Sequence, residues 1–158
     1  MTSNEPPDLR RAPLEALIQR AQGLVEALPY IRQFRNANIV IKYGGAAMVD
    51  SVLKEKIIQD IALMATVGMH PVVVHGGGPE VTALMKKLGM TPQFIQGQRI
   101  TDAETLEVAE MVLAGKIGSE LTLTLNRAGV PPVSLSGKDM GLILARKLFH
   151  QEHAQAPM

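Results

Sequence analysis

Two glycine-rich turns and two basic side chains are the residues of this sequence best suited to chemistry. The turns are Lys42-Tyr43-Gly44-Gly45 and His75-Gly76-Gly77-Gly78, and each follows an apolar run. Glycine has no Cβ, so a ligand can approach the backbone of such a turn closely. Lys42 can neutralise phosphate oxygens, or it can simply extend from a strand end into solvent. Together these residues favour a site for an anionic ligand.

The second turn opens a predicted helix. Pro79 suits the first helical position, where its missing N–H costs nothing, and Gly89 ends the helix. Free N–H groups and the positive end of the helix dipole at such an N-terminus attract an anion. The apolar face of this helix is predicted to contain Val81, Leu84, Met85 and Leu88. Neither turn matches a dinucleotide fingerprint or a Walker A motif, which disfavours a dinucleotide enzyme.

Three further polar residues allow two interpretations each. Arg99 precedes a capped helix; its planar fork suits a carboxylate, but it can equally be a surface arginine. His75 is predicted to be a strand-end histidine held by hydrogen bonds rather than a metal ligand, because no partner has ligand spacing. Asp139 is predicted to serve its turn rather than a site.

No metal site is predicted. His150 and His153 lie in a polar tail that we expect to be solvated, with weak metal binding as the alternative. Cysteine is absent, which excludes disulfides and fits a reducing cytoplasm. The polar start of the chain lacks the features of a signal peptide.

These residues are positioned by alternating strands and helices. Strands are predicted at 39–43 and 72–75, the second buried on both faces, and a helix capped by Asp50 or Ser51 lies between them. Its buried stripe is predicted to be Leu53, Ile57, Ile61 and Met64. The βαβα order implies an α/β fold with a parallel sheet.

The second half of the sequence has weaker signals. Thr101-Asp102-Ala103-Glu104 reads as a capping box, and the helix behind it is broken or bent at Gly115 and Gly118. Further strands are predicted at 133–135 and 142–145, around a turn. No periodicity is evident over 91–100.

The N-terminal segment is predicted to be a frayed tail over 1–12 and a helical arm over 13–36, kinked at Pro29. Its apolar face is predicted to contain Leu14, Leu17, Ile18, Ala21, Leu24, Val25 and Leu28. This helix either covers its own domain or pairs with another subunit.

Composition excludes several classes of function. A net charge of +1 without a basic run argues against nucleic acid, and 3% aromatic residues argue against base stacking. No apolar run is long enough to span a membrane. An apolar fraction of 46% in 158 residues predicts one ordinary domain with a real core.

Five segments together resemble the N-acetyl-L-glutamate kinase family of the amino-acid kinase superfamily. They are Ile39–Met48, Pro71–Glu80, Gly97–Asp102, Met111–Lys116 and Ser136–Asp139. The resemblance covers residues 38–148. It implies a three-layer αβα sandwich with a mostly parallel sheet, truncated to the N-terminal half. Departures from the family pattern are Gln98, Ile117-Gly118-Ser119 and Met140.

The resemblance also implies an activity: ATP-dependent phosphorylation of the γ-carboxylate of N-acetyl-L-glutamate, in arginine biosynthesis. Lys42 would stabilise the transferring phosphoryl group, and Gly44 and Gly45 would lie against the phosphates of ATP, which brings Mg²⁺. Gly77 and Gly78 would bind the substrate through N–H groups, and Arg99 would hold a carboxylate. The helical arm resembles that of hexameric, arginine-sensitive members, which implies a homo-oligomer, dimer or hexamer, with possible arginine feedback.

The family's remaining site groups, an Asn, an Asp and a second Lys, lie in a second half that the resemblance does not reach. We therefore expect an amino-acid-binding lobe over 37–149 and a polar tail over 150–158, with little or no kinase activity alone. The alternatives are a non-catalytic acetylglutamate-binding or oligomer-assembly module, and an unrelated nucleotide-binding domain.

Overall fold

The structure is a computed structural model that describes residues 13–146. The predicted tails at 1–12 and 150–158, with His150 and His153, lie outside the described residues. The chain divides into two compact units, residues 1–75 and 76–158, and the boundary falls inside the predicted lobe. Each unit is described by itself. The first contains α1 (Leu14–Phe34), β1 (Asn38–Tyr43), α2 (Ala46–Val49), α3 (Ser51–Thr66) and β2 (His70–His75).

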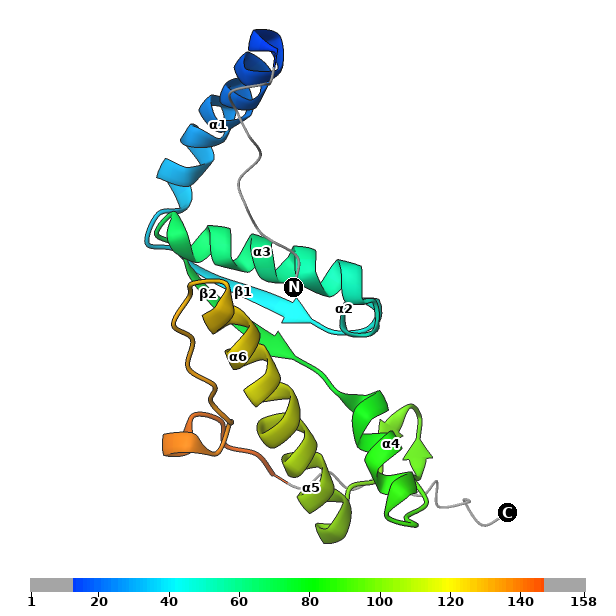
Figure 1. The fold of residues 1–158 in the computed structure, drawn as a ribbon. Helices are drawn as coiled ribbons and strands as arrows, with labels where there is room; N and C mark the ends of the chain where they lie inside the picture. Colours follow the sequence, from blue (N-terminus) through cyan, green and yellow to red (C-terminus); the bar gives the residue numbers. More distant parts are fainter. Residues whose placement is uncertain (1–12, 147–158) are drawn as a thin grey trace, which may run out of the picture. The chain divides into compact units, whose positions relative to one another are not determined.

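The first unit is built on two parallel strands. β1 and β2 pair from Asn38↔His70 to Tyr43↔His75, and α3 connects them and lies along the sheet (Figure 1). Asp50 begins α3, because its Oδ1 accepts from the N–H groups of Val52 and Leu53 at 2.9 and 3.0 Å. The predicted α/β class with a parallel sheet is confirmed.

Only one face of this sheet is well covered. Burial alternates along both strands, and Val40, Val72 and Val74 are 70%, 49% and 54% exposed. The prediction that 72–74 is buried on both faces is therefore wrong. Within the first unit α3 packs against β2, and side chains that alternate along a strand cannot all face one helix.

The buried face of α3 is displaced from the predicted stripe. The buried residues are Ile58, Ile61 and Ala62, whereas Leu53 is 38% exposed. Of the predicted residues only Ile61 is fully buried. A run of adjacent apolar residues, Ile57-Ile58 and Ile61-Ala62, gives two similar helical faces, so periodicity alone could not choose between them.

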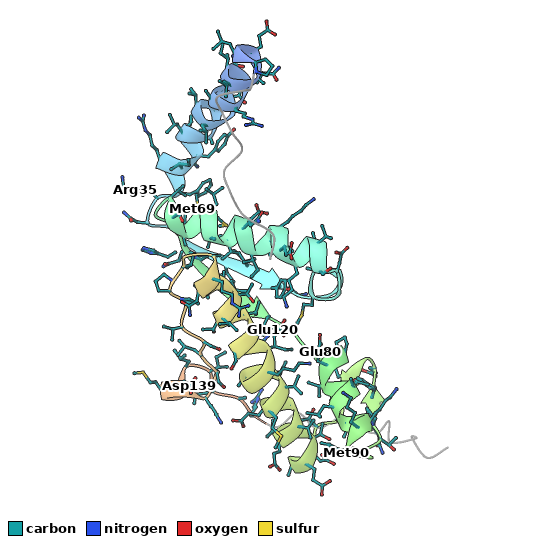
Figure 2. The ribbon with its side chains drawn as sticks, viewed as in Figure 1. Arg35, Met69, Glu80, Met90, Glu120 and Asp139 are labelled. Atoms are coloured by element: carbon teal, nitrogen blue, oxygen red, sulfur yellow. The ribbon has the colours of Figure 1, made fainter. Side chains whose placement is uncertain are left out.

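One helix, α1, covers the predicted N-terminal arm, and Pro29 lies inside it rather than ending it. None of its residues is buried: Leu14 and Leu24 are both 72% exposed. A turn follows in which Asn36 adopts a φ of 63° and donates its N–H to the Gly68 carbonyl at 2.7 Å. Figure 2 shows Arg35 and Met69 at this corner of the first unit.

The second unit is mostly helical. It contains α4 (Gly78–Lys87), β3 (Phe94–Ile95), β4 (Gln98–Arg99), α5 (Ala103–Glu110), the π-helix η2 (Met111–Gly118), α6 (Ser119–Arg127) and the 3₁₀ turn η3 (Asp139–Gly141). Its buried residues come from α4 and from the continuous run of α5, η2 and α6: Val81, Met85, Thr105, Val108, Val112, Ile117, Leu121 and Leu125. Packing between these helices forms the core of the unit.

The helix predicted to be broken or bent at Gly115 and Gly118 is not broken there, since α5 continues through the π-helix η2 into α6. Between Val112 and Ile117, the buried positions are five residues apart, whereas the next interval, to Leu121, is four. A π-helix closes i→i+5 hydrogen bonds, so its wider turn accommodates this longer interval. The buried residues Val108, Val112, Ile117, Leu121 and Leu125 therefore form one continuous face.

Residues 91–100, which show no periodicity, contain a short antiparallel hairpin. β3 and β4 pair Phe94 with Arg99 and Ile95 with Gln98. The two turn residues, Gln96 and Gly97, have φ angles of 49° and 78°. Positive φ at both central positions matches a type I′ turn, whose twist suits a tight hairpin.

The strands predicted at 133–135 and 142–145 do not form. Val133, Leu135 and Leu144 are 81%, 66% and 92% exposed, and neither segment pairs with another strand in the described part of the chain. A strand needs a neighbour for its backbone hydrogen bonds. The sequence between these segments does form a turn, closed by the Asp139 N–H to the Ser136 carbonyl at 3.0 Å.

The helix cap before α5 is Asp102 rather than the predicted Thr101. The Asp102 Oδ1 accepts from the Thr105 N–H at 2.8 Å. This hydrogen bond favours the ionised carboxylate and lowers the pKa of Asp102. Thr101 and Asp102 can both cap a helix, and Asp102 is the residue that caps α5.

Candidate functional site

The first glycine turn leaves its backbone open. Lys42 is exposed and pairs with Val74 in the register of the sheet, one residue before the end of β1. A Cβ built on Gly44 meets no atom within 4 Å, and neither does one on Gly45. Gly45 has a φ of 62°, a conformation that favours glycine. These features leave room for a ligand at the backbone and place a cation next to it.

Gly77 and Gly78 of the second turn are in different surroundings. A Cβ on Gly77 would lie 2.4 Å from the Ile117 Cδ1 and 2.6 Å from the Leu113 Cδ2, so the turn is packed directly on η2. A Cβ on Gly78 meets nothing within 4 Å. Close packing therefore explains why position 77 is a glycine. At position 78 packing gives no such reason, and the open backbone leaves room for a ligand.

Gly77 is also the N-cap of α4, and no side chain caps this helix. Pro79 follows as the second helical residue, one position later than predicted. Glu80 lies in the first turn (Figure 2), and its buried Oε2 accepts no hydrogen bond from the described residues. The N–H groups of the first turn therefore remain available to an acceptor.

Arg99 lies against this first turn. Its Nη2 donates to the Gly78 carbonyl at 3.0 Å and to the Thr82 Oγ1 at 2.7 Å, and its Nη1 contacts the Met85 Sδ at 3.2 Å. Positions 78, 82 and 85 share one face of a helix. The guanidinium therefore follows that face from the start of α4.

The charges around this helix face are mixed. Arg99 contacts α4 from the Gly78 carbonyl to the Met85 Sδ, and Glu80 places a carboxylate in the first turn of the same helix. An exposed donor of Arg99 can bind a carboxylate or phosphate.

Of the predicted site residues, the structure brings together Gly78 and Arg99, with Gly77 one residue away along the chain. Lys42, Gly44 and Gly45 belong to the first unit. Within the first unit, the carboxyl ends of the parallel strands β1 and β2 lie at one edge of the sheet, and ligands of open α/β sheets bind at such ends.

The residues that hold Arg99 were missed by sequence reasoning. Thr82 is four residues after Gly78, on the same face of the helix, and Phe94 is opposite Arg99 in the hairpin. The Gln96-Gly97 pair was the available signal for the hairpin, since X-Gly is typical of a type I′ turn. Asp139 serves its turn, as predicted: its Oδ2 accepts from the Ser136 N–H at 2.5 Å.

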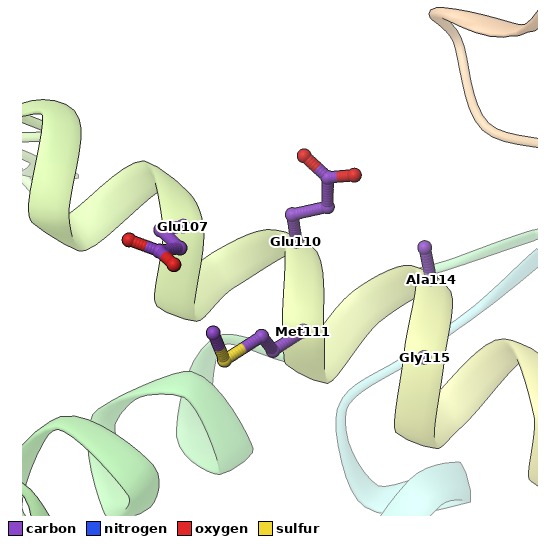
Figure 3. Close-up of a pocket in the computed structure, with 5 residues that line it drawn as sticks. All are labelled: Glu107, Glu110, Met111, Ala114 and Gly115. Atoms are coloured by element: carbon purple, nitrogen blue, oxygen red, sulfur yellow. The ribbon is translucent and has the colours of Figure 1, made fainter.

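A pocket on α5 and η2 is lined by none of the predicted site residues. It is lined by Glu107, Glu110, Met111, Ala114 and Gly115 (Figure 3). Lys138 forms an ion pair with Glu110, which raises the pKa of Lys138. Two carboxylates on its wall make this pocket unsuitable for an anionic ligand.

The geometry and the sequence agree on a class of protein. The chain belongs to the amino acid kinase family, whose model matches residues 38–156. Within that family it is similar to proteins named acetylglutamate kinase. The protein from Symbiobacterium thermophilum is 52% identical over 141 residues, which is 89% of this chain and 48% of that protein. The protein from Moorella thermoacetica is 58% identical over 130 residues, 82% of this chain and 44% of that protein.

A solved structure supports the fold. The N-acetylglutamate synthase from Neisseria gonorrhoeae, complexed with coenzyme A and N-acetyl-glutamate, matches with a TM-score of 0.59 and 31% identity, over 72% of this chain and 26% of that one. The chain spans about half the length of the curated relatives it matches. Among the described residues, no helix is both long and apolar enough to cross a membrane.

Proposed function

We propose that this chain is the acetylglutamate-binding half of an ATP-dependent acetylglutamate kinase. In this reaction a γ-carboxylate oxygen of N-acetyl-L-glutamate attacks the γ-phosphorus of ATP. The bond from that phosphorus to the bridging oxygen breaks, ADP leaves, and an acyl phosphate forms. The identity to relatives of that name supports the reaction. In this proposal the enzyme acts in arginine biosynthesis, in the cytoplasm.

The placement of Arg99 at the uncapped start of α4 is the observation that carries the proposal. N-acetylglutamate is a dianion, and this region offers a guanidinium, the free N–H groups of the first turn and an open face at Gly78. In this proposal Arg99 binds a substrate carboxylate, and Gly77 and Gly78 contribute backbone donors. The positive helix end strengthens the attraction.

The turn after β1 suits the phosphates of ATP, which brings Mg²⁺. Gly44 and Gly45 leave the backbone unobstructed, and Lys42 is exposed beside them. In the proposal Lys42 neutralises charge on the transferring phosphoryl group, and the two glycines let phosphate oxygens reach the main chain. Phosphoryl transfer depends mainly on such positioning and charge neutralisation.

Calorimetry with N-acetylglutamate on the 158-residue chain tests this assignment. We expect binding that weakens at least tenfold in Arg99→Ala, because a hydrogen bond to a charged group contributes about 1.5–3 kcal/mol. Arg127→Ala, at the end of α6, is the matched control and should bind as the wild type. Absence of binding, or unchanged affinity in Arg99→Ala, would refute the assigned site. Affinity for nucleotide without affinity for acetylglutamate would instead favour an unrelated nucleotide-binding domain.

An activity assay on the chain alone distinguishes a complete kinase from a non-catalytic binding module. A coupled ADP-release assay with acetylglutamate and ATP should give little or no turnover; rates of about 1–100 per second would show that the chain is a complete kinase.

The alternative is an assembly module that acts through α1. This helix buries none of its residues, and its apolar side chains Leu14, Leu24 and Val25 are 72%, 72% and 64% exposed. Burial against a second copy would remove this surface from water. Sedimentation distinguishes the two: an oligomer without acetylglutamate affinity favours assembly alone. Possible feedback by arginine is part of the hypothesis that the chain forms an oligomer through α1.

A further inference from the structure

Arg99 is held by a partner on the hairpin that carries it. Phe94 is directly opposite Arg99 in the β3–β4 register, and the guanidinium carbon lies 4.7 Å from the centre of the Phe94 ring. This distance is within the range of a cation–π contact. The ring is 53% exposed, so it contributes little to the core. The guanidinium is therefore a contact of this ring outside the core.

A second partner comes from α4. Thr82 accepts a 2.7 Å hydrogen bond from Nη2, and the same nitrogen donates to the Gly78 carbonyl at 3.0 Å. The stacking ring fixes the plane of the guanidinium, and the two oxygens fix its rotation within that plane. With the Met85 Sδ, which lies 3.2 Å from Nη1, four groups from two elements determine the orientation of one flexible side chain.

The donors that remain are available to a ligand. A guanidinium has five N–H groups. Within residues 13–146 the protein accepts from Nη1 and Nη2 but not from Nε. The Nε–H group and a second hydrogen on Nη1 are therefore left for an external acceptor. The clamp orients Arg99 without using all of its binding capacity.

We propose that Thr82 and Phe94 are positioning residues, which hold Arg99 in the orientation that receives the substrate carboxylate. The proposal rests on the proposed function, in which Arg99 binds that carboxylate. An unclamped arginine loses rotamer freedom when a ligand binds, and a clamped one has already lost it. Removing one clamp should weaken binding roughly three- to tenfold, the range expected for immobilising one long side chain.

Calorimetry of N-acetylglutamate binding to the full chain tests the proposal with paired variants. Thr82→Val removes the acceptor, and Thr82→Ser retains it; Phe94→Leu removes the aromatic face, and Phe94→Tyr retains it. We expect a three- to tenfold loss for the first member of each pair and near wild-type affinity for the second. Thr124→Val on α6 is the control, because its hydroxyl bonds only to the Glu120 carbonyl of its own helix.

A ligand-free measurement keeps the test independent of the proposed function. The Arg99 side-chain N–H signals in NMR report rotation of the guanidinium, which should be slow in the wild type and in Thr82→Ser, and faster in Thr82→Val and Phe94→Leu. This signal reports the clamp itself, whereas the loss of acetylglutamate affinity in the same variants reports its role in binding.

The outcomes are distinguishable. If Arg99→Ala loses affinity but Thr82→Val and Phe94→Leu bind as the wild type, the positioning proposal is overturned and the proposed function stands. Unchanged guanidinium rotation in both variants overturns it as well. If the wild type does not bind acetylglutamate, the proposed function fails, whereas slow rotation lost in the variants would still support the clamp.

Discussion

Gly77 and Gly78 should respond in opposite ways to the same substitution. In Gly77→Ala, the new methyl would lie 2.4 Å from the Ile117 Cδ1 and 2.6 Å from the Leu113 Cδ2, and Ile117 is only 5% exposed. Overpacking of this kind destabilises by about 1–3 kcal/mol. Replacing glycine by alanine also lowers the conformational entropy of the unfolded chain, which raises the unfolding free energy by about 0.4–1 kcal/mol. We therefore expect a net loss of about 1–2 kcal/mol of unfolding free energy.

Gly78→Ala is the matched control. Its Cβ meets no atom within 4 Å, and the residue is the first of α4, where alanine is preferred to glycine. Stability should be unchanged or raised by up to about 1 kcal/mol, whereas affinity for acetylglutamate should fall if ligand approaches the backbone there.

Urea unfolding followed by peptide-resolved hydrogen exchange over 76–127 measures both effects in the unit that contains the glycines. Ile117→Val removes the Cδ1 methyl and costs about 0.5–1.5 kcal/mol alone, so it should relieve part of the Gly77→Ala defect when the two are combined. The relief is partial because the Leu113 Cδ2 remains. A Gly77→Ala variant as stable as the wild type, or a double variant whose losses simply add, would refute the packing argument.

Two further predictions concern helix caps. Asp50→Ala should lower the unfolding free energy by about 1 kcal/mol, whereas Ser51→Ala should have almost no effect, because only Asp50 accepts the N–H groups of α3; equal losses in urea titrations would contradict this. The pKa of Asp102 is lowered by the Thr105 N–H, so its contribution to stability is present above about pH 3.8 and is lost as pH falls through the lower pKa of the folded state. Asp102→Asn keeps a cap but carries no charge, and acid unfolding should show that this part of the pH dependence disappears; an unchanged acid profile would count against it.

The sequence predicted those features that depend on local chemistry. Buried-type β-branched runs predicted β1 and β2, and Gly89 predicted the end of a helix, where it adopts a φ angle of 77°. Asp50 was one of two caps that the sequence allowed. Arg99 and Gly78 were proposed separately as substrate-binding residues, and in the structure the Arg99 Nη2 lies 3.0 Å from the Gly78 carbonyl oxygen.

Features that depend on residues far away in the sequence could not be predicted from local patterns. Residues 133–135 have the composition of a strand, but strand pairing needs a neighbour that no local pattern reveals. The π-helix was hidden because helical periodicity assumes a constant turn, and the interval of five between Val112 and Ile117 looks like a break. The exposure of Val72 and Val74 was not predicted, because a run of β-branched residues does not indicate whether one or both faces of the sheet are covered.

The second glycine turn shows why packing and binding have to be considered together. Gly77 packs on η2, where a larger residue would displace the Ile117 and Leu113 side chains, and Gly78 immediately follows with its surroundings open and its carbonyl bonded to Arg99. A binding backbone must be held rigidly to present its N–H groups in a constant direction. One glycine thus anchors the turn, and the next leaves room for a ligand. The π-helix belongs to this arrangement, because Leu113 and Ile117, the two residues that anchor the turn, both lie within it.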